Sequence, residues 1–563
     1  MPDDTYDAIV VGSGITGGWA AKELTEKGLR TLVVERGRAV EHGKDYITES
    51  LQPWEIPHRG RGERELYARD YPIQSKNYAF GETTRHFFVS DREHPYITDG
   101  PQEFRWIRGY HLGGRSLIWG RASWRWSDLD FAANATDGHG VDWPIRYKDL
   151  APWYDHVERF VGVAGENLGL AHLPDQNLLP AWEMNCAERV VKEGLERAFP
   201  GRHLTMTRVA NLTRPHQGRG QCQARNQCGR GCSYGAYFSS LSSTLPAARA
   251  TGRLTVVTDA IVESVIYDDK RDRVTGVRVI DAKTRQSREY FARVVFLNAS
   301  TIGTAQILLN SRSARFPDGL ANSSGEVGHN LMDHLSKAGA RGNVPGLEGD
   351  YVSGRRPTGT YTPRFRNLRA GESGRLGFVR GYGIQSGAGR AGWDRGMSSP
   401  GIGTALKASL RTPGAWGMTM QGYVECLPRH ENHIALDEKK DQWGIPIVNI
   451  RWSWSDNERA ARADMKTQSA EMLAAGGCTD VETYDNDAPM GFSVHEMGTA
   501  RMGRDPKTSV LNAHNQAHDV PNLFVTDGAC MTSSSCVNPS LTYMAITARA
   551  VDHAVSELNR RNL

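Results

Sequence analysis

Three cysteines lie close together in the stretch "CQARNQCGRGCSYG", residues 222–235. Cys222, Cys228 and Cys232 are three of the chain's eight cysteines, and their spacing is C-x5-C-x3-C. Three thiols cannot all pair with one another, so the group does not form a disulfide staple by itself. Zinc favours about two to four residues between paired ligands and needs a fourth ligand, for which His216 is a candidate. From the residues alone, a metal site and free thiols both remain open.

A second stretch, "YDAIVVGSGITGGWAAKELTEKGLRTLVVERG", contains a glycine pattern that binds dinucleotides. Gly12, Gly14 and Gly17 form G-x-G-x-x-G, and Glu35 follows 23 residues after Gly12. The first glycine permits a tight turn, the second lets the backbone approach a pyrophosphate, and the third allows a helix to pack closely on a strand. The acidic side chain can accept hydrogen bonds from a ribose diol. The fingerprint alone does not distinguish FAD from NAD.

The elements around this turn are those that the fingerprint requires. "AIVV" is a continuous apolar run, as expected for a buried parallel strand. "GGWAAKELTEKG" has the composition of a helix that Gly28 ends, and "RTLVVE" is a second strand. Near the C-terminus, "NLFVTDGA" predicts a buried strand that ends at Asp527, and "SLTYMAITARAVDHAVSEL" predicts a helix. Because Asp527 is anionic, we expect it to bond a ribityl or other hydroxyl group rather than a phosphate.

Composition limits the possible classes of protein. The 563 residues predict two to four domains or two large interleaved ones, and 39% of them are hydrophobic. The net charge is +4 with scattered basic residues, which argues against a nucleic-acid partner. No apolar run reaches the roughly 18–20 residues needed to span a bilayer. The first basic residue is Lys22, so we expect the chain to carry no export signal of its own.

Five further motifs occur in a fixed order along the chain. They are "RGYHLGGRSLIWGRAS" (108–123), "DWPIRYKDLAPWYDHVERFVGVAG" (142–165), "RLTVVTDAIVESVIYD" (253–268), "VVFLNASTIGTAQILLNS" (294–311) and "NLFVTDGACMTSSSCVNPSLTYMAITARA" (522–550). Together with the glycine fingerprint they resemble the glucose–methanol–choline (GMC) family of FAD oxidoreductases, from about residue 5 to the C-terminus. The resemblance implies FAD as the cofactor.

The resemblance also implies a mixed α/β fold, in which a Rossmann-like FAD-binding domain is interleaved with a sheet-based substrate-binding domain. We expect residues 1–50, 105–140, 205–335 and 490–563 to form the FAD domain, with a cysteine insert at 215–235. Residues 51–104, 141–204 and 336–489 would form the substrate domain and its covering loops, with 345–405 mostly loop. Gly113, Gly114 and Ser116 would lie in the loop over the flavin, and Val262 would meet the adenine.

Oxidation of an alcohol requires a group that removes the hydroxyl proton while hydride leaves the carbon for flavin N5, and histidine suits this role. "GFSVHEMGTARMG" resembles the family motif that carries the catalytic histidine, which assigns His495 as the base. Many members have a second histidine where this chain has Asn538, and we expect Asn538 to orient the substrate oxygen. Ile118 occupies the place where some relatives bond FAD covalently, so we expect noncovalent FAD. Gln421, Tyr423 and Glu425 alternate along one predicted strand and either reach the sugar or form a plain sheet face.

The cysteine spacing resembles an insert in the large subunits of bacterial FAD sugar dehydrogenases, which carry a [3Fe–4S] cluster and pass electrons to a cytochrome. The resemblance therefore implies a glucoside 3-dehydrogenase-like catalytic subunit, with iron–sulfur ligands at Cys222, Cys228 and Cys232. It also implies a cytochrome c acceptor and a small signal-bearing partner that takes the chain to the periplasm; a chain acting alone would be cytoplasmic. Alternatives are an oxygen-using sugar or C-glycoside 3-oxidase, a gluconate or polyol dehydrogenase, and a flavin-binding subunit without catalysis.

Overall fold

The computed structural model describes residues 4–352, 354, 356–369 and 371–563. Its larger sheet has the order β7-β2-β1-β10-β9-β8, with β18 also paired to β10. The pairs β2–β7, β1–β2, β1–β10 and β10–β18 are parallel, whereas β9 joins β10 and β8 in antiparallel register. The strands are β1 (Thr5–Val11), β2 (Thr31–Val34), β7 (Leu254–Val257), β8 (Ala260–Asp268), β9 (Arg273–Asp281), β10 (Ser287–Leu297) and β18 (Leu523–Val525).

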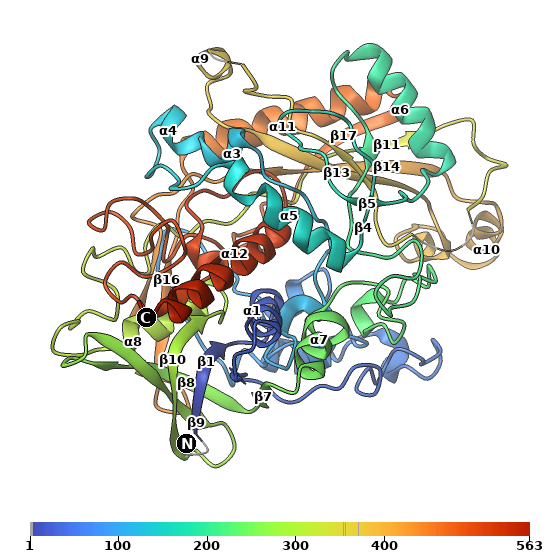
Figure 1. The fold of residues 1–563 in the computed structure, drawn as a ribbon. Helices are drawn as coiled ribbons and strands as arrows, with labels where there is room; N and C mark the ends of the chain where they lie inside the picture. Colours follow the sequence, from blue (N-terminus) through green and yellow to red (C-terminus); the bar gives the residue numbers. More distant parts are fainter. Residues whose placement is uncertain (1–3, 353, 355, 370) are drawn as a thin grey trace.

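The predicted strand–turn–helix–strand unit is confirmed. Helix α1 (Ile15–Glu26) follows β1 directly and packs against α12 (Ser540–Asn559), as Figure 1 shows. Gly12 has φ +94°, and a Cβ at this position would lie 2.4 Å from the Asn298 carbonyl oxygen. A Cβ on Gly17 would lie 1.9 Å from the Gly12 carbonyl oxygen. Both positions therefore require glycine, because any side chain would force the helix away from the sheet.

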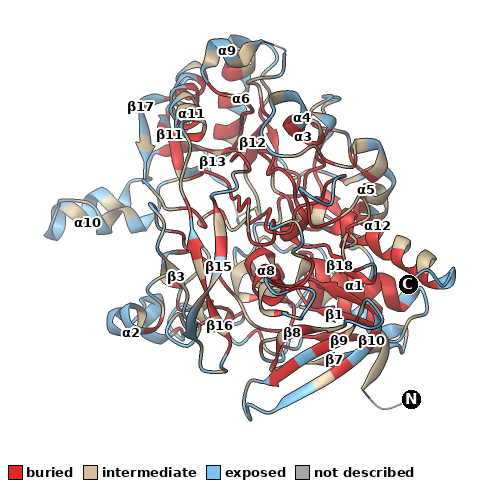
Figure 2. Ribbon diagram, turned by 90° about the vertical axis from the view of Figure 1, so that its left-hand side faces the viewer, coloured by how far each residue is buried: buried red, intermediate tan, exposed pale blue. Residues whose placement is uncertain are grey.

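The second sheet is antiparallel and has the order β17-β11-β14-β13-β12-β6. Helices α6 (Cys186–Ala198) and α11 (Asp456–Ala475) pack against it, and Figure 1 shows them at the far end of the molecule from β1. Figure 2 shows the buried residues concentrated on the central strands and on α1, α8 (Thr301–Asn310) and α12. The strands are β6 (Thr205–Met206), β11 (Ala338–Val344), β12 (Thr360–Thr362), β13 (Tyr382–Arg390), β14 (Trp416–Val424) and β17 (Thr479–Asp485).

The remaining strands and helices complete the fold. A three-stranded sheet has the order β15-β16-β3, and β4 pairs with β5. The three-stranded sheet consists of β3 (Ile97–Thr98), β15 (His433–Lys440) and β16 (Pro446–Arg451). The two-stranded sheet consists of β4 (Val163–Ala164) and β5 (Leu178–Leu179). The other helices are α2 (Arg64–Asp70), α3 (Asp128–Phe131), α4 (Ala133–Asp137), α5 (Tyr147–Val161), α7 (Leu245–Ala250), α9 (Glu372–Leu376) and α10 (Gly403–Arg411). None of the described helices combines the length and apolar character that crossing a bilayer requires.

One strand was not expected. Most of the segment 345–405 is loop, as expected, but it also contains β13, which lies in the middle of the second sheet. Its sequence "YGIQSGAGR" has small residues where strands usually carry branched or aromatic ones, which hid the strand. The motif at 253–268 forms two strands, β7 and β8, and Asp259 between them has φ +54°.

The domain boundaries expected from the resemblance stay a prediction. All seven strands of the larger sheet lie in segments assigned to the FAD domain. Five of the six strands of the second sheet lie in 336–489. The exception is β6, which lies in the segment 205–335 but pairs with β12 of the second sheet.

Candidate active site

A cavity of about 510 Å³ lies between the two sheets. Its walls come from the carboxyl ends of β1, β2 and β10, from the loop 106–122, from β8 and from the start of α12. The second sheet contributes Gln385 on β13 and Tyr423 on β14. The residues expected at the site that line this cavity are Gly12, Gly14, Glu35, Gly114, Ser116, Val262, His495, Asp527 and Asn538. The sequence therefore identified residues that are far apart in the chain and meet at one cavity.

The glycine turn forms one end of the cavity. A Cβ built on Gly14 would meet no atom within 4 Å, so this backbone faces open space where a ligand can approach. The Glu35 carboxylate accepts hydrogen bonds from Ser13 N at 3.1 Å and Ser13 Oγ at 2.5 Å, and from Gly37 N at 2.9 Å. Burial raises the pKa of Glu35, while these donors oppose the increase. The turn and the acidic residue are thus held rigidly relative to each other.

The loop expected over the flavin is tied to this turn. Gly113 N donates to Ser13 Oγ at 2.9 Å, and Ser116 Oγ donates to the Gly113 carbonyl at 2.5 Å. Ser240 N in turn donates to Ser116 Oγ at 3.0 Å. Gly113 packs against Leu241, and Gly17 packs against the Gly12 backbone. Neither glycine lines the cavity, so both shape the site through its neighbouring backbone.

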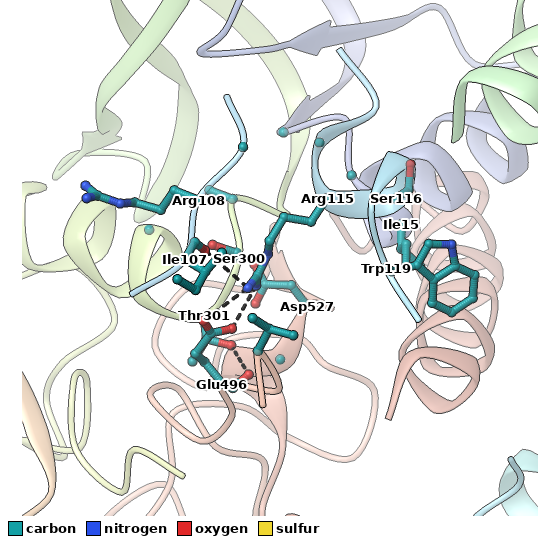
Figure 3. Close-up of a pocket in the computed structure, with 18 of the residues that line it drawn as sticks. Ile15, Ile107, Arg108, Arg115, Ser116, Trp119, Ser300, Thr301, Glu496 and Asp527 are labelled. Atoms are coloured by element: carbon teal, nitrogen blue, oxygen red, sulfur yellow. Dashed lines mark hydrogen bonds and ion pairs between the residues drawn. The ribbon is translucent and has the colours of Figure 1, made fainter. Parts of the chain in front are cut away.

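Asp527 lies just after β18, facing the cavity. Its carboxylate accepts from Thr304 Oγ1 at 2.5 Å and from Ala529 N at 2.9 Å. Burial raises its pKa to about 6. Close by, the guanidinium of Arg115 forms a two-pronged ion pair with Glu496, at 3.1 and 2.7 Å, and Figure 3 shows this pair beside Asp527. The sequence analysis missed the Arg115–Glu496 pair, because nothing in the local spacing marks it.

The proposed catalytic residues are within hydrogen-bonding distance of each other. Asn538 Nδ2 lies 3.2 Å from His495 Nε2. Asn538 Oδ1 accepts from Gln385 Nε2 at 2.8 Å, so the amide nitrogen is the atom that faces the histidine. Burial, with smaller effects of His334 and Arg115, holds the pKa of His495 well below its ordinary value. The imidazole is therefore neutral at neutral pH and can accept a proton.

An aspartate holds the loop that carries His495. The Asp333 carboxylate accepts from Gly491 N at 2.9 Å and from His495 N at 3.0 Å. Val494, between them, has φ +57°, a conformation that β-branched residues rarely adopt. Burial, and the nearby Glu496, raise the pKa of Asp333 to about 7. Sequence reasoning missed this residue, which lies 162 positions before His495.

Only part of the expected substrate face reaches the cavity. Tyr423 lines it, and Gln421 Nε2 donates to the Tyr423 hydroxyl at 3.2 Å. Glu425 instead forms a buried ion pair with Arg380 at 2.7 Å. Lys337, which the sequence analysis did not single out, also lines the cavity and stacks over the Tyr78 ring at 5.5 Å.

The cysteines line a separate small pocket of about 20 Å³. Cys222, Cys228 and Cys232 all contribute to its wall, and burial raises the pKa of the Cys222 and Cys232 thiols. Nevertheless, among the described residues no group of three or more His, Cys, Asp or Glu side chains is arranged to hold a metal ion. His216 is not the fourth ligand of such a site, because its Nε2 bonds the Arg159 carbonyl at 2.8 Å and it does not line this pocket.

The cavity fits FAD by its own chemistry. Asn298 Oδ1 and the Tyr543 hydroxyl are buried in its wall, and neither has a hydrogen-bond partner among the described residues. Buried polar atoms without partners are rare, so these two indicate a polar ligand. The open backbone at Gly14 and the acidic Glu35 supply the pyrophosphate and ribose ends of a dinucleotide site.

Comparison with known proteins identifies the family. The models of the GMC oxidoreductase family match residues 6–336 and 428–547. The chain belongs to the GMC oxidoreductase family. It is 28% identical to the fructose dehydrogenase large subunit of Gluconobacter japonicus, over 98% of each chain. It is 30% identical to the 2-methyl-1,2-propanediol dehydrogenase of Mycolicibacterium austroafricanum, over 98% of this chain and 95% of that one.

Solved structures support the fold. A formate oxidase of Aspergillus oryzae RIB40, studied for the effect of a mutation on FAD modification, superposes with a TM-score of 0.63 at 15% identity, over 99% of each chain. The family and this fold confirm a mixed α/β GMC oxidoreductase with an FAD-binding Rossmann-like domain and a second, sheet-based domain. The protein is an FAD-dependent oxidoreductase that acts on CH–OH groups.

Proposed function

We propose that this GMC oxidoreductase oxidises a ring hydroxyl of a sugar to a ketone, and that the hydroxyl is at C3 of a glucoside or free hexose. The observation that carries the proposal is the neutral His495 beside Asn538 in the wall of the cavity that fits FAD. When bound, FAD supplies the acceptor for the hydride. Polar groups at the other wall, Gln385 and Tyr423, suit a ligand with several hydroxyl groups.

The residues of the chain divide the reaction between them. His495 Nε2 takes the proton of the reacting hydroxyl, and Asn538 Nδ2 donates a hydrogen bond to the same oxygen. This contact holds the carbon in one orientation while the hydride departs. The Arg115–Glu496 pair keeps the region next to His495 structured, because each charge satisfies the other in a mostly buried position.

Two groups of substrate are the main alternatives. A relative named for fructose supports a sugar, whereas a relative named for 2-methyl-1,2-propanediol supports a polyol. The purified protein should be mixed without oxygen with methyl glucoside, glucose, gluconate and a short diol, and flavin reduction followed by absorbance. Fast reduction by methyl glucoside and a 3-keto product support the proposal. Reduction by gluconate or the diol alone favours the alternative dehydrogenase.

We also propose that electrons leave through the cysteine insert to a cytochrome c rather than to oxygen, and that Cys222, Cys228 and Cys232 hold a [3Fe–4S] cluster when iron is supplied. Support comes from the three thiols lining one pocket, although as they stand they do not form a metal-ligating group. We further propose that a small partner subunit with an export signal takes the chain to the periplasm. The fructose dehydrogenase relative is itself named a large subunit. High peroxide yield in air, with slow reduction of cytochrome or dye, favours an oxidase instead.

A further inference from the structure

A second histidine lies behind the catalytic one. His334 is 2% exposed and lies just before β11. Its Nδ1 is 2.9 Å from His495 Nδ1. Its Nε2 lies 3.1 Å from the Ser534 carbonyl oxygen and 2.9 Å from the Ser535 carbonyl oxygen. The two imidazole rings meet nearly at right angles, with centroids 5.0 Å apart.

These contacts fix where the protons are. A carbonyl oxygen only accepts hydrogen bonds, so His334 Nε2 must carry a proton and donate it to Ser534 and Ser535. Burial lowers the pKa of His334, so its ring is neutral and its Nδ1 is a bare acceptor. The short contact between the two Nδ1 atoms then requires the proton to be on His495 Nδ1. As a consequence, His495 Nε2 carries no proton and presents its lone pair.

The amides on the other side of the pair match this arrangement. Gln385 Nε2 donates to Asn538 Oδ1 at 2.8 Å, which turns the Asn538 amide nitrogen toward His495 Nε2. An amide nitrogen only donates, so His495 Nε2 must be the acceptor. The contacts of His334 therefore require, and the amides of Asn538 and Gln385 fit, the same tautomer of His495, the one that can remove a proton from an alcohol.

We propose that His334 is a positioning residue that locks His495 in the tautomer with the proton on Nδ1, and that Gln385 fixes the amide of Asn538 to match. The inference rests on the proposed role of His495 as the base. When His495 becomes an imidazolium, its Nδ1–H still has an acceptor in His334 Nδ1, which stabilises the charged form. The chain of donors ends at two carbonyl groups, which do not take up protons, so the proton on His495 leaves from its Nε2 side.

Other titratable groups near the two rings do not replace this contact. Arg115 acts on His495 only through its positive charge, and Glu425 acts on His334 at a distance while paired to Arg380. Asp333 bonds the His495 backbone rather than its ring. The Tyr423 ring centroid lies 6.3 Å from that of His495. Among the described residues, His334 alone is recorded as a hydrogen-bond partner of His495 Nδ1.

The test compares two variants of the FAD-bound full chain. In His334→Leu the acceptor is lost. In His334→Gln the amide oxygen can accept from His495 Nδ1, and the amide nitrogen can donate to a carbonyl. The readouts are the rate of flavin reduction by the best hydroxyl substrate without oxygen, its pH profile, KM and bound FAD. We expect the leucine variant to reduce flavin about 10- to 150-fold more slowly, the usual effect of losing a hydrogen bond to a charged group. KM and bound FAD should change little.

The pH profile separates positioning from a merely structural role. Without the acceptor, the His495 imidazolium is less stable, so the acid limb of the profile should move to lower pH in His334→Leu and stay in place in His334→Gln. Gln385→Met, which removes the hydrogen-bond donor to Asn538 but keeps a side chain of similar size, should also slow flavin reduction without moving the acid limb.

If wild-type protein reduces flavin with a hydroxyl substrate and His334→Leu matches its rate and pH profile, the inference is overturned. Equal losses of the flavin-reduction rate in both His334 variants, together with loss of bound FAD, also overturn the inference. A wild-type protein that no hydroxyl compound reduces refutes the proposed function instead.

Discussion

Replacing Gly14 by alanine should weaken FAD binding without destabilising the protein. A Cβ at Gly14 would meet no protein atom within 4 Å, and Gly14 lines the cavity where we expect the pyrophosphate of FAD to approach the backbone. Gly14 has φ −63° and ψ −160°, which alanine adopts without strain. Gly17 provides the matched control, because a Cβ there would lie 1.9 Å from the Gly12 carbonyl oxygen within the protein itself.

The expected magnitudes follow from these contacts. In the apoprotein, alanine at position 14 gains about 0.4–1 kcal/mol by restricting the unfolded chain and loses a similar amount as a poorer N-cap residue. In the complex, displacement of the pyrophosphate loses at least one hydrogen bond to a charged group, about 1.5–3 kcal/mol, which is about 10- to 150-fold in affinity. Gly17→Ala, in contrast, should destabilise the apoprotein itself, since overlap in a packed region costs about 1–3 kcal/mol or more.

The assay is titration of FAD-depleted protein with FAD, followed by quenching of flavin fluorescence, alongside urea unfolding of the same apoproteins. We expect Gly14→Ala to have a wild-type unfolding midpoint and weak FAD binding, and Gly17→Ala to have a lowered midpoint. Wild-type FAD affinity in Gly14→Ala would show that the pyrophosphate does not lie against this turn, and the assignment of the cavity would be wrong.

Three other results are expected. Acid precipitation should release free flavin, since Ile118 offers no atom for a covalent bond; flavin retained in the pellet would contradict this. Because burial lowers the pKa of His495 from 6.5, the acid limb that belongs to His495 should lie below pH 6.5, and a rate that does not fall at any pH below 6.5 would contradict its role as the base; a limb near pH 7 belongs to Asp333, whose pKa is raised to about 7. In protein prepared without oxygen and supplied with iron, we expect about three irons per flavin, as the cluster type implies, and Cys228→Ser should lose iron but keep FAD. Iron-free wild-type protein with full activity toward its natural acceptor would refute the cluster.

Local patterns identified the parts of the site that short segments encode. The glycine fingerprint and Asp527 were found because strand, turn and helix follow one another within a few residues. His495 and Asn538 were found because each lies in a family motif. The positioning partners were missed, since Gln385 lies 153 residues from Asn538 and His334 lies 161 residues from His495. Such contacts depend on how the two sheets meet, and no spacing in the sequence encodes that.

In the fold, too, the sequence reveals the elements that short local patterns encode and misses those that depend on contacts between distant segments. The parallel strands β1, β2 and β10 are apolar runs that the sequence reveals directly. Strand β13 was not recognised, because its glycines, serine and alanine fit between neighbouring strands through their small size rather than their apolar character. The cysteine insert was recognised as a group, and the structure places all three thiols at one pocket, but the spacing alone does not determine whether they converge on a metal.

The central claim is that His495 removes a hydroxyl proton while bound FAD takes the hydride, and the most direct measurement is the reductive half-reaction without oxygen. Wild-type protein and His495→Ala, each with FAD bound, should be mixed with the best hydroxyl substrate in a stopped-flow instrument. The account predicts rapid bleaching of the wild-type flavin and bleaching about 10²- to 10⁴-fold slower in the variant, the usual contribution of general base catalysis. Bleaching of fully flavinated His495→Ala at the wild-type rate would contradict the account.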